Sequence, residues 1–202
     1  MSIPWLEDKI KAMKIGSDYS RGIWIPIKGG DFTINHLYSS LEPILADCNF
    51  NIYDDIFIDS PLSYDLNILT AHGDEDISTI SSLFTNDNEA IYNIGNIIGS
   101  GKILILFVCH SGSMKKGLFE SKINSFVRSF LENGYQAVIA PFWPLHISIP
   151  PIWLKEFLFK FNSGCTLSQS FYSANLKVEE KYPTPGAWAC LHFYGNPNLK
   201  LK

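Results

Sequence analysis

The chain has 202 residues, of which 46% are hydrophobic and 18% are charged, and its formal net charge is −4. This composition can supply a sizeable core, excludes a disordered chain, and argues against a general nucleic-acid binder, which would be basic. The longest apolar run, residues 103–109, is far shorter than the roughly 20 residues of a membrane helix. Residues 1–14 lack a signal-peptide pattern, and the four cysteines form no C-x-x-C pair. We expect a cytoplasmic protein with reduced thiols and without a metal or other cofactor.

The N-terminal part of the chain is predicted to form an extension, residues 1–20, ahead of a single domain, residues 21–202. The extension carries an apolar stripe at helical spacing, which we expect to dock against the core. This stripe comprises Ile3, Leu6, Ile10 and Met13. Short strands are predicted next, where apolar residues are bounded by Gly, Pro and Asp, at 21–28, 51–59 and 66–71.

The middle of the chain alternates between predicted helices and strands. Residues 88–98 are expected to be helical, with Asn86 or Asp87 as the cap. Residues 102–109 are apolar at nearly every position, which is typical of a central strand covered on both faces. An amphipathic helix is expected over 118–133 and a buried strand over 135–140.

The C-terminal part continues the same alternation. A helix is predicted over 150–161, and Thr166 with Gln169 fits a capping box that begins another helix. A strand over 187–194 closes the chain. Alternating strands and helices from residue 66 onward predict an α/β fold, with a mostly parallel sheet between helices on both faces.

Two predicted strands end in residues that could perform catalysis. One runs into His72-Gly73 and the other into Cys109-His110-Ser111-Gly112. The carboxyl ends of parallel strands lie at one edge of the sheet, where ligands bind, so a thiol and an imidazole would meet there. Such a pair supplies a nucleophile and its base. A lone cysteine on an apolar strand is more often a small buried residue, so spacing alone leaves both interpretations open.

The residues of these motifs resemble those of the caspase-like cysteine peptidases, and in particular those of the CHAT branch. H-G at 72–73 and C-H-S-G at 109–112 are similar to the family's His and Cys motifs. Residues 129–144 resemble its F-L-x-x-G-A-x-x-V-I-A-x-x-W-P stretch, and residues 188–195 resemble its closing W-A-x-F-x-x-Y-G. The four motifs occur in the family's order. The resemblance implies a caspase-like three-layer sandwich.

By the same resemblance, Cys109 is the nucleophile and His72 the general acid or base. The backbone N–H groups of Gly73 and Cys109 would line the oxyanion hole, and no acidic third member is required. The resemblance further implies cleavage of a specific protein target in bacterial defence or cell death, with a regulatory or sensor protein as a possible partner. Phe107 stands where sister branches carry an Asp, so a pocket for a basic residue is not supplied from that position.

The distribution of charge bears on substrate preference. Residues 29–101 contain twelve Asp and Glu and no Lys or Arg. A run of acidic residues usually forms a solvated surface. The functional alternative is an acidic rim at the site that attracts an Arg or Lys of the substrate. Asp55, Asp74 and Asp76 are the candidate substrate-binding residues of that rim.

Other candidate residues and functions were weighed against this prediction. His110 is expected to be structural, since it points away from its neighbour Cys109 in an extended strand. Cys190 and His192 are expected to pack within the closing strand. His36 and His146 have no identifiable partner in the sequence. The main alternative function is a non-catalytic CHAT-like scaffold within a larger complex. A different α/β hydrolase is disfavoured because the chain has no G-x-S-x-G elbow.

Overall fold

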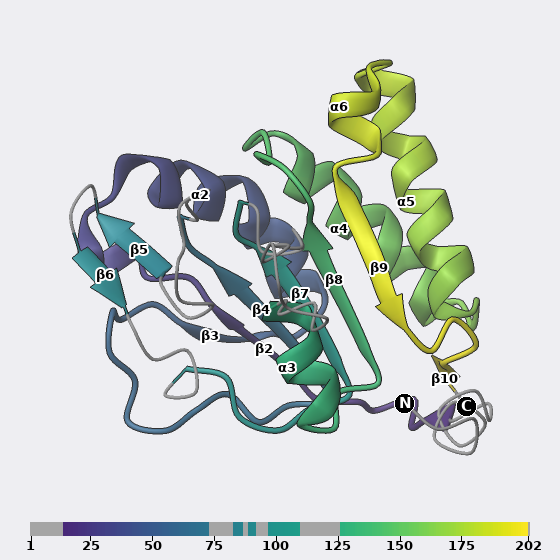
Figure 1. Ribbon diagram of the computed structural model, residues 1–202, viewed down its shortest axis with the longest axis horizontal. Coiled ribbons are helices and arrows are strands. Elements are labelled where there is room, and N and C mark those ends of the chain that lie inside the picture. Colours follow the sequence, from purple (N-terminus) through teal and green to yellow (C-terminus); the bar gives the residue numbers. More distant parts are fainter. Residues whose placement is uncertain (1–13, 73–82, 87–88, 92–96, 110–125, 202) are drawn as a thin grey trace, which may run out of the picture.

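A six-stranded sheet forms the centre of the protein. The computed structural model describes residues 14–72, 83–86, 89–91, 97–109 and 126–201, and the structural statements below concern these residues. The sheet has the order β3-β2-β4-β7-β8-β9 (Figure 1). Its strands are β2 (Arg21–Trp24), β3 (Asn51–Tyr53), β4 (Leu66–Thr70), β7 (Ile103–Phe107), β8 (Ala137–Pro141) and β9 (Leu191–Gly195). All neighbours are parallel except β8 and β9. The predicted α/β class with a mostly parallel sheet is confirmed.

Helices cover both faces of this sheet, which makes three layers (Figure 1). On one face, α2 (Phe32–Asp47), α4 (Ile149–Asn162) and α5 (Leu167–Lys181) bury their apolar sides against alternate strand residues. On the other face, α3 (Phe126–Glu132) packs on the remaining strand residues. Two apolar clusters, one on each side of the sheet, therefore form the core.

The central strands are buried along their whole length, as their apolar sequences predict. Every residue of β4, β7 and β8 is buried. The two polar residues of β4 are both hydrogen-bonded: Asn67 Nδ2 donates to the Tyr135 hydroxyl at 2.8 Å, and Thr70 Oγ1 donates to the Trp24 carbonyl at 3.0 Å. Buried polar groups need such partners, so these two bonds tie β4 to its surroundings.

Local sequence signals account for the ends of several helices. The predicted capping box of α5 is confirmed, because Gln169 N donates to Thr166 Oγ1 while the Gln169 side chain accepts from Thr166 N. Helix α2 was not predicted from the sequence. It begins after Asp31, whose Oδ1 accepts a hydrogen bond from Ile34 N at 2.8 Å.

The structure corrects two predicted elements. The helix expected over 88–98 is wrong at its start, where β5 (Leu83–Asn86) and β6 (Glu89–Ile91) pair in an antiparallel arrangement. Asp and Asn favour hairpin turns as well as helix caps, so the Asn-Asp-Asn sequence was ambiguous. The strand expected over 187–194 is preceded by a helical turn, α6 (Pro185–Trp188), because proline is well suited to a first helical position.

Some predicted elements lie partly or wholly outside the described residues. The N-terminal stripe at residues 3–13 and the first part of the helix expected over 118–133 are among them. The described N-terminal strand β1 (Lys14–Ile15) pairs with β10 (Lys200–Leu201). Among the described helices, none combines the length and the apolar character needed to span a bilayer.

Candidate active site

The strand register aligns the two predicted catalytic positions. Within the parallel pair β4–β7, Thr70 is the partner of Phe107. The Ala71 N–H donates to the Phe107 carbonyl at 3.5 Å, which is the hydrogen bond that closes this last pair of the ladder. His72 and Cys109 each lie two residues beyond this last pair, at the same edge of the sheet. The carboxyl ends of β4 and β7 therefore bring the two positions together.

Both positions lie on the α2/α4 side of the sheet. Alternate residues of β4 and β7 face this side, ending with Phe107 in β7. His72 and Cys109 have the same parity as these residues. Their contacts agree, because His72 meets the start of α2 and Cys109 meets the segment that leads into α4.

His72 is held by a carboxylate. Its Nε2 lies 2.9 Å from Oδ2 of Asp31. The Asp31 side chain is only 8% exposed, whereas His72 is 37% exposed. Because the other Asp31 oxygen caps α2, one carboxylate fixes both the helix start and the imidazole ring.

This contact determines how the imidazole can act. An ionised carboxylate can only accept hydrogen bonds, so Nε2 of His72 must be the donor. In the neutral ring, Nδ1 is then unprotonated and available as a base. With a proton on Nδ1 as well, the imidazolium would still face the same carboxylate, an arrangement that is also found in the base–carboxylate pairs of hydrolases.

Cys109 is half-buried and receives a hydrogen bond at its sulfur. The Leu145 N–H donates to Cys109 Sγ at an N···S distance of 3.4 Å. Asp31, His72, Cys109 and Leu145 lie in the segments that follow the adjacent strands β2, β4, β7 and β8, in sheet order. This hydrogen bond fixes the position of the Cys109 sulfur at the edge of the sheet.

Cys190 has a different environment from Cys109. It is fully buried, and burial raises the pKa of its thiol to about 12. Its Sγ lies 3.5 Å from the carbonyl oxygens of Trp143 and Pro144. Cys190 therefore remains a thiol at neutral pH and holds the segment that carries Leu145, in agreement with the predicted packing role.

The other histidines contact aromatic rings. His192 stacks on Phe142 with ring centroids 5.1 Å apart, as expected for a packing residue. His36 stacks on Phe32, and His146 lies against Tyr182. These contacts supply the partners that sequence analysis could not name for His36 and His146.

The remaining predicted site residues are divided between described and undescribed segments. Asp55 is exposed, and its carboxylate lies 2.9 Å from Lys28 Nζ, which also contacts Asp54 at 3.0 Å. Gly73, Asp74, Asp76 and His110 lie outside the described residues. Within the described ranges, no group of three or more His, Cys, Asp or Glu side chains is arranged to hold a metal ion.

Asp31 is the site residue that sequence analysis missed. A local signal was present, because Gly-Gly-Asp precedes apolar residues at helical spacing, which is the pattern of a capped helix. This pattern could have predicted α2. The contact with His72 is tertiary and has no counterpart in local sequence.

Comparison with known proteins relates the fold to cysteine peptidases. No family model and no curated protein matches the sequence. Among solved structures, the chain is similar to separase in the Saccharomyces cerevisiae separase–securin complex, with a TM-score of 0.65 and 14% identity over 98% of this chain. It is also similar to the Arg-specific cysteine proteinase gingipain R, with a TM-score of 0.59 and 12% identity over 96% of this chain. The chain spans 13% of the separase chain and 51% of the gingipain chain. The caspase-like, three-layer fold is thus shared with these proteins.

Proposed function

We propose that the protein is a cysteine endopeptidase of the caspase/CHAT type in which Cys109 and His72 form the catalytic dyad. The observation that carries the proposal is that the two residues follow the carboxyl ends of the adjacent strands β4 and β7, with Asp31 bound to the imidazole. The fold shared with separase and gingipain R supports it.

The proposed reaction proceeds through a thioester. The Cys109 thiolate attacks the scissile carbonyl carbon, and the carbonyl oxygen becomes an oxyanion stabilised by the backbone N–H groups of Gly73 and Cys109. When the C–N bond breaks, protonated His72 gives its proton to the leaving amine. His72 then removes a proton from a water molecule that attacks the thioester, and the thiolate leaves with release of the carboxylic acid product.

Asp31 has a positioning role in this proposal. It does not touch the substrate, but it holds His72 with Nδ1 unprotonated and stabilises the imidazolium that forms after proton uptake. The Leu145 N–H has a second supporting role, because its hydrogen bond holds the Cys109 sulfur in place.

Selective alkylation and turnover test the proposal together. With iodoacetamide at pH 7.5, mass spectrometry should find Cys109 modified first. Cys190 is the internal control and should stay unmodified until the protein is unfolded, because its pKa is raised by burial. The Cys109→Ala variant should fold normally and lose peptidase activity. Retained turnover in this variant would remove Cys109 from the mechanism. Slow, unselective labelling without turnover would favour the non-catalytic scaffold.

The substrate of the proposed peptidase is a specific protein target in bacterial defence or cell death, on the strength of the CHAT resemblance. Near the cleaved bond, we propose a basic residue attracted by Asp55, Asp74 and Asp76. Asp54 and Asp55 share one lysine, so this pair keeps a net negative charge. Cleavage of matched peptides with Arg, Lys, Asp or Leu at the cleaved position measures the preference, and a preference for Asp would contradict it.

A further inference from the structure

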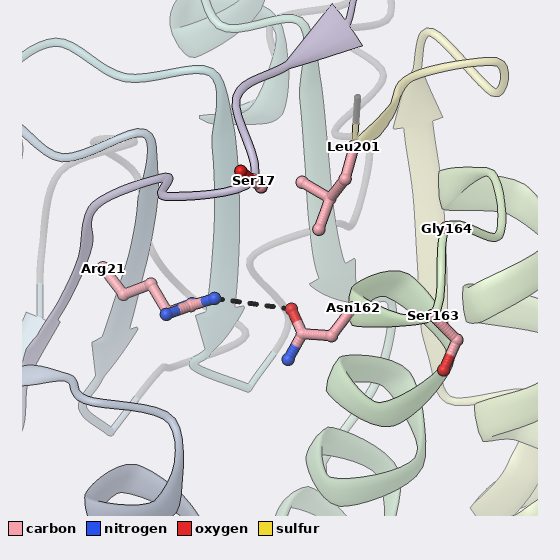
Figure 2. A pocket seen from close by; sticks show the side chains of 6 residues that line it. All are labelled: Ser17, Arg21, Asn162, Ser163, Gly164 and Leu201. Atoms are coloured by element: carbon pink, nitrogen blue, oxygen red, sulfur yellow. Dashed lines mark hydrogen bonds between the residues drawn. The ribbon is translucent and has the colours of Figure 1, made fainter.

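A cavity with an excess of hydrogen-bond donors lies at the opposite edge of the sheet from His72 and Cys109. It has a volume of about 430 Å³ and lies where β2 begins, α4 ends and β10 passes. Figure 2 shows Arg21 and Asn162 pointing toward one another beside it. Its lining residues are Ser17, Arg21, Asn162, Ser163, Gly164 and Leu201.

Arg21 has no acidic partner among the described residues. Its guanidinium donates to two neutral oxygens, the Cys48 carbonyl at 3.0 Å and Asn162 Oδ1 at 3.4 Å. The Tyr19 ring lies beneath it, 3.9 Å from the guanidinium carbon. The buried Nε–H has no acceptor. A guanidinium carries five N–H donors, so Arg21 has more donors than these contacts use.

Asn162 adds further donors to the same cavity. Its Oδ1 accepts from both the Tyr19 hydroxyl at 2.9 Å and Arg21, which fixes the orientation of the side-chain amide. The Nδ2 group has no acceptor within the described part of the chain, so its two hydrogens can be donated to a ligand. Ser17 contributes a hydroxyl, whose contact with Asp18 is long at 3.5 Å. Asp18 places a carboxylate next to the Ser17 hydroxyl.

An apolar cavity of about 360 Å³ adjoins the first and shares Asn162 and Ser163 with it. Its apolar lining comes from the facing sides of α2 and α4 and comprises Pro43, Ile44, Leu158 and Phe159. Phe159 is 63% exposed. Asp47 and Lys155 also line it, with opposite charges. Together the two cavities have a cationic end and an apolar end, at the scale of a small-molecule site.

We propose that this paired cavity binds a small carboxylic acid with an apolar body. The carboxylate would take the unused N–H groups of Arg21 and Asn162, since the guanidinium fork matches a planar carboxylate. The apolar body would lie between α2 and α4, against Ile44 and Phe159. The inference goes beyond the proposed peptidase function and does not depend on it.

The test compares hexanoate with hexanamide, which differ in the charged group alone, by titration of the ¹⁵N-labelled protein. Hexanoate should shift the Gly164 amide and Arg21 Nε–H signals saturably, and hexanamide should bind at least about tenfold more weakly. Equal binding of the two would overturn the carboxylate site. Phosphate that binds as tightly as hexanoate would overturn the apolar part of the proposal.

Variants separate binding from folding. Arg21→Met should weaken hexanoate binding by about tenfold or more. Arg21 also ties β2 to the end of α2, so its replacement affects folding as well as the cavity. The second variant is therefore Asn162→Asp, which changes an exposed residue and places a negative charge at the cavity. Asn133→Asp, an exposed position after α3, is its matched control and should bind normally. Asp18→Asn should strengthen binding about two- to threefold by removal of the nearby carboxylate. Unchanged binding in Asn162→Asp would overturn the proposal.

Discussion

The two edges of the central sheet differ in how their polar groups are satisfied. At the carboxyl edge, His72 and Cys109 each have one fixed partner, Asp31 and the Leu145 N–H. At the amino edge, Asp65 binds Lys102 at 2.7 Å and accepts two hydrogen bonds from Ser20. The carboxyl edge therefore orients groups that can react, whereas the amino edge joins the beginnings of β2, β4 and β7.

The largest expected effect is at the imidazole of the carboxyl edge. His72→Ala should reduce kcat by about a thousandfold or more if the proposed dyad is correct, because general base and acid are both lost. The rate of hydrolysis of a cleavable peptide measures the loss of kcat, and the melting temperature of the variant is the control for folding. A variant that keeps normal turnover would show that His72 is not part of the mechanism.

A smaller effect is expected when the Asp31 carboxylate is replaced. Asp31→Asn keeps an oxygen that can cap α2, so the melting temperature should change little. The kcat should fall by about a hundredfold or more, with a smaller change in KM, because the imidazole loses its charged partner. Asp31→Ala is the comparison, since it should also lose about 1 kcal/mol of stability with the cap. Equal activity of Asp31→Asn and the parent protein would leave Asp31 with a structural role alone.

The amino edge should affect stability and not catalysis. Burial by itself raises the pKa of Asp65, but the hydrogen bonds from Lys102 and Ser20 outweigh it and hold the pKa below its ordinary value of 3.8. Its contribution is therefore present above that value and lost as the pH falls through the lowered folded-state pKa. At pH 7, Asp65→Asn should cost about 1 kcal/mol of unfolding free energy, with kcat unchanged.

Denaturant unfolding of both proteins between pH 2 and pH 7 measures this contribution. The stability difference between the parent and Asp65→Asn should shrink toward the acid end of the range. A difference that stays constant with pH would show that the carboxylate charge of Asp65 does not contribute.

The smallest expected effect concerns Lys28, which is exposed and shared by Asp54 and Asp55. If Asp55 attracts a basic substrate residue, Lys28→Ala should lower KM for an Arg peptide a few-fold by removal of the competing cation, with kcat unchanged. A Leu peptide is the control and should show no change. An unaltered KM for the Arg peptide would exclude Asp55 from substrate binding.

Local sequence patterns predicted most strands of the sheet, but fewer of the elements that surround the candidate site. The apolar runs at 66–71 and 102–109 contain the buried strands β4 and β7, and the run at 135–140 covers all of β8 except Pro141. The helix expected over 88–98 is wrong over Glu89–Ile91, which form a strand, because Asn and Asp serve hairpins and helix caps alike. Helix α2 was missed although Asp31 precedes an apolar stripe at helical spacing.

The sequence by itself determined which segments are buried strands and which residues stand at their ends, because hydrophobic periodicity and turn chemistry are local properties. It therefore predicted His72 and Cys109 as candidates at the carboxyl edge. Only the tertiary structure decided that Asp31 meets His72, that Leu145 meets Cys109, and that Arg21 and Asn162 share a cavity. These contacts join residues far apart in the chain, and their geometry depends on how the helices pack against the sheet, which no local pattern encodes.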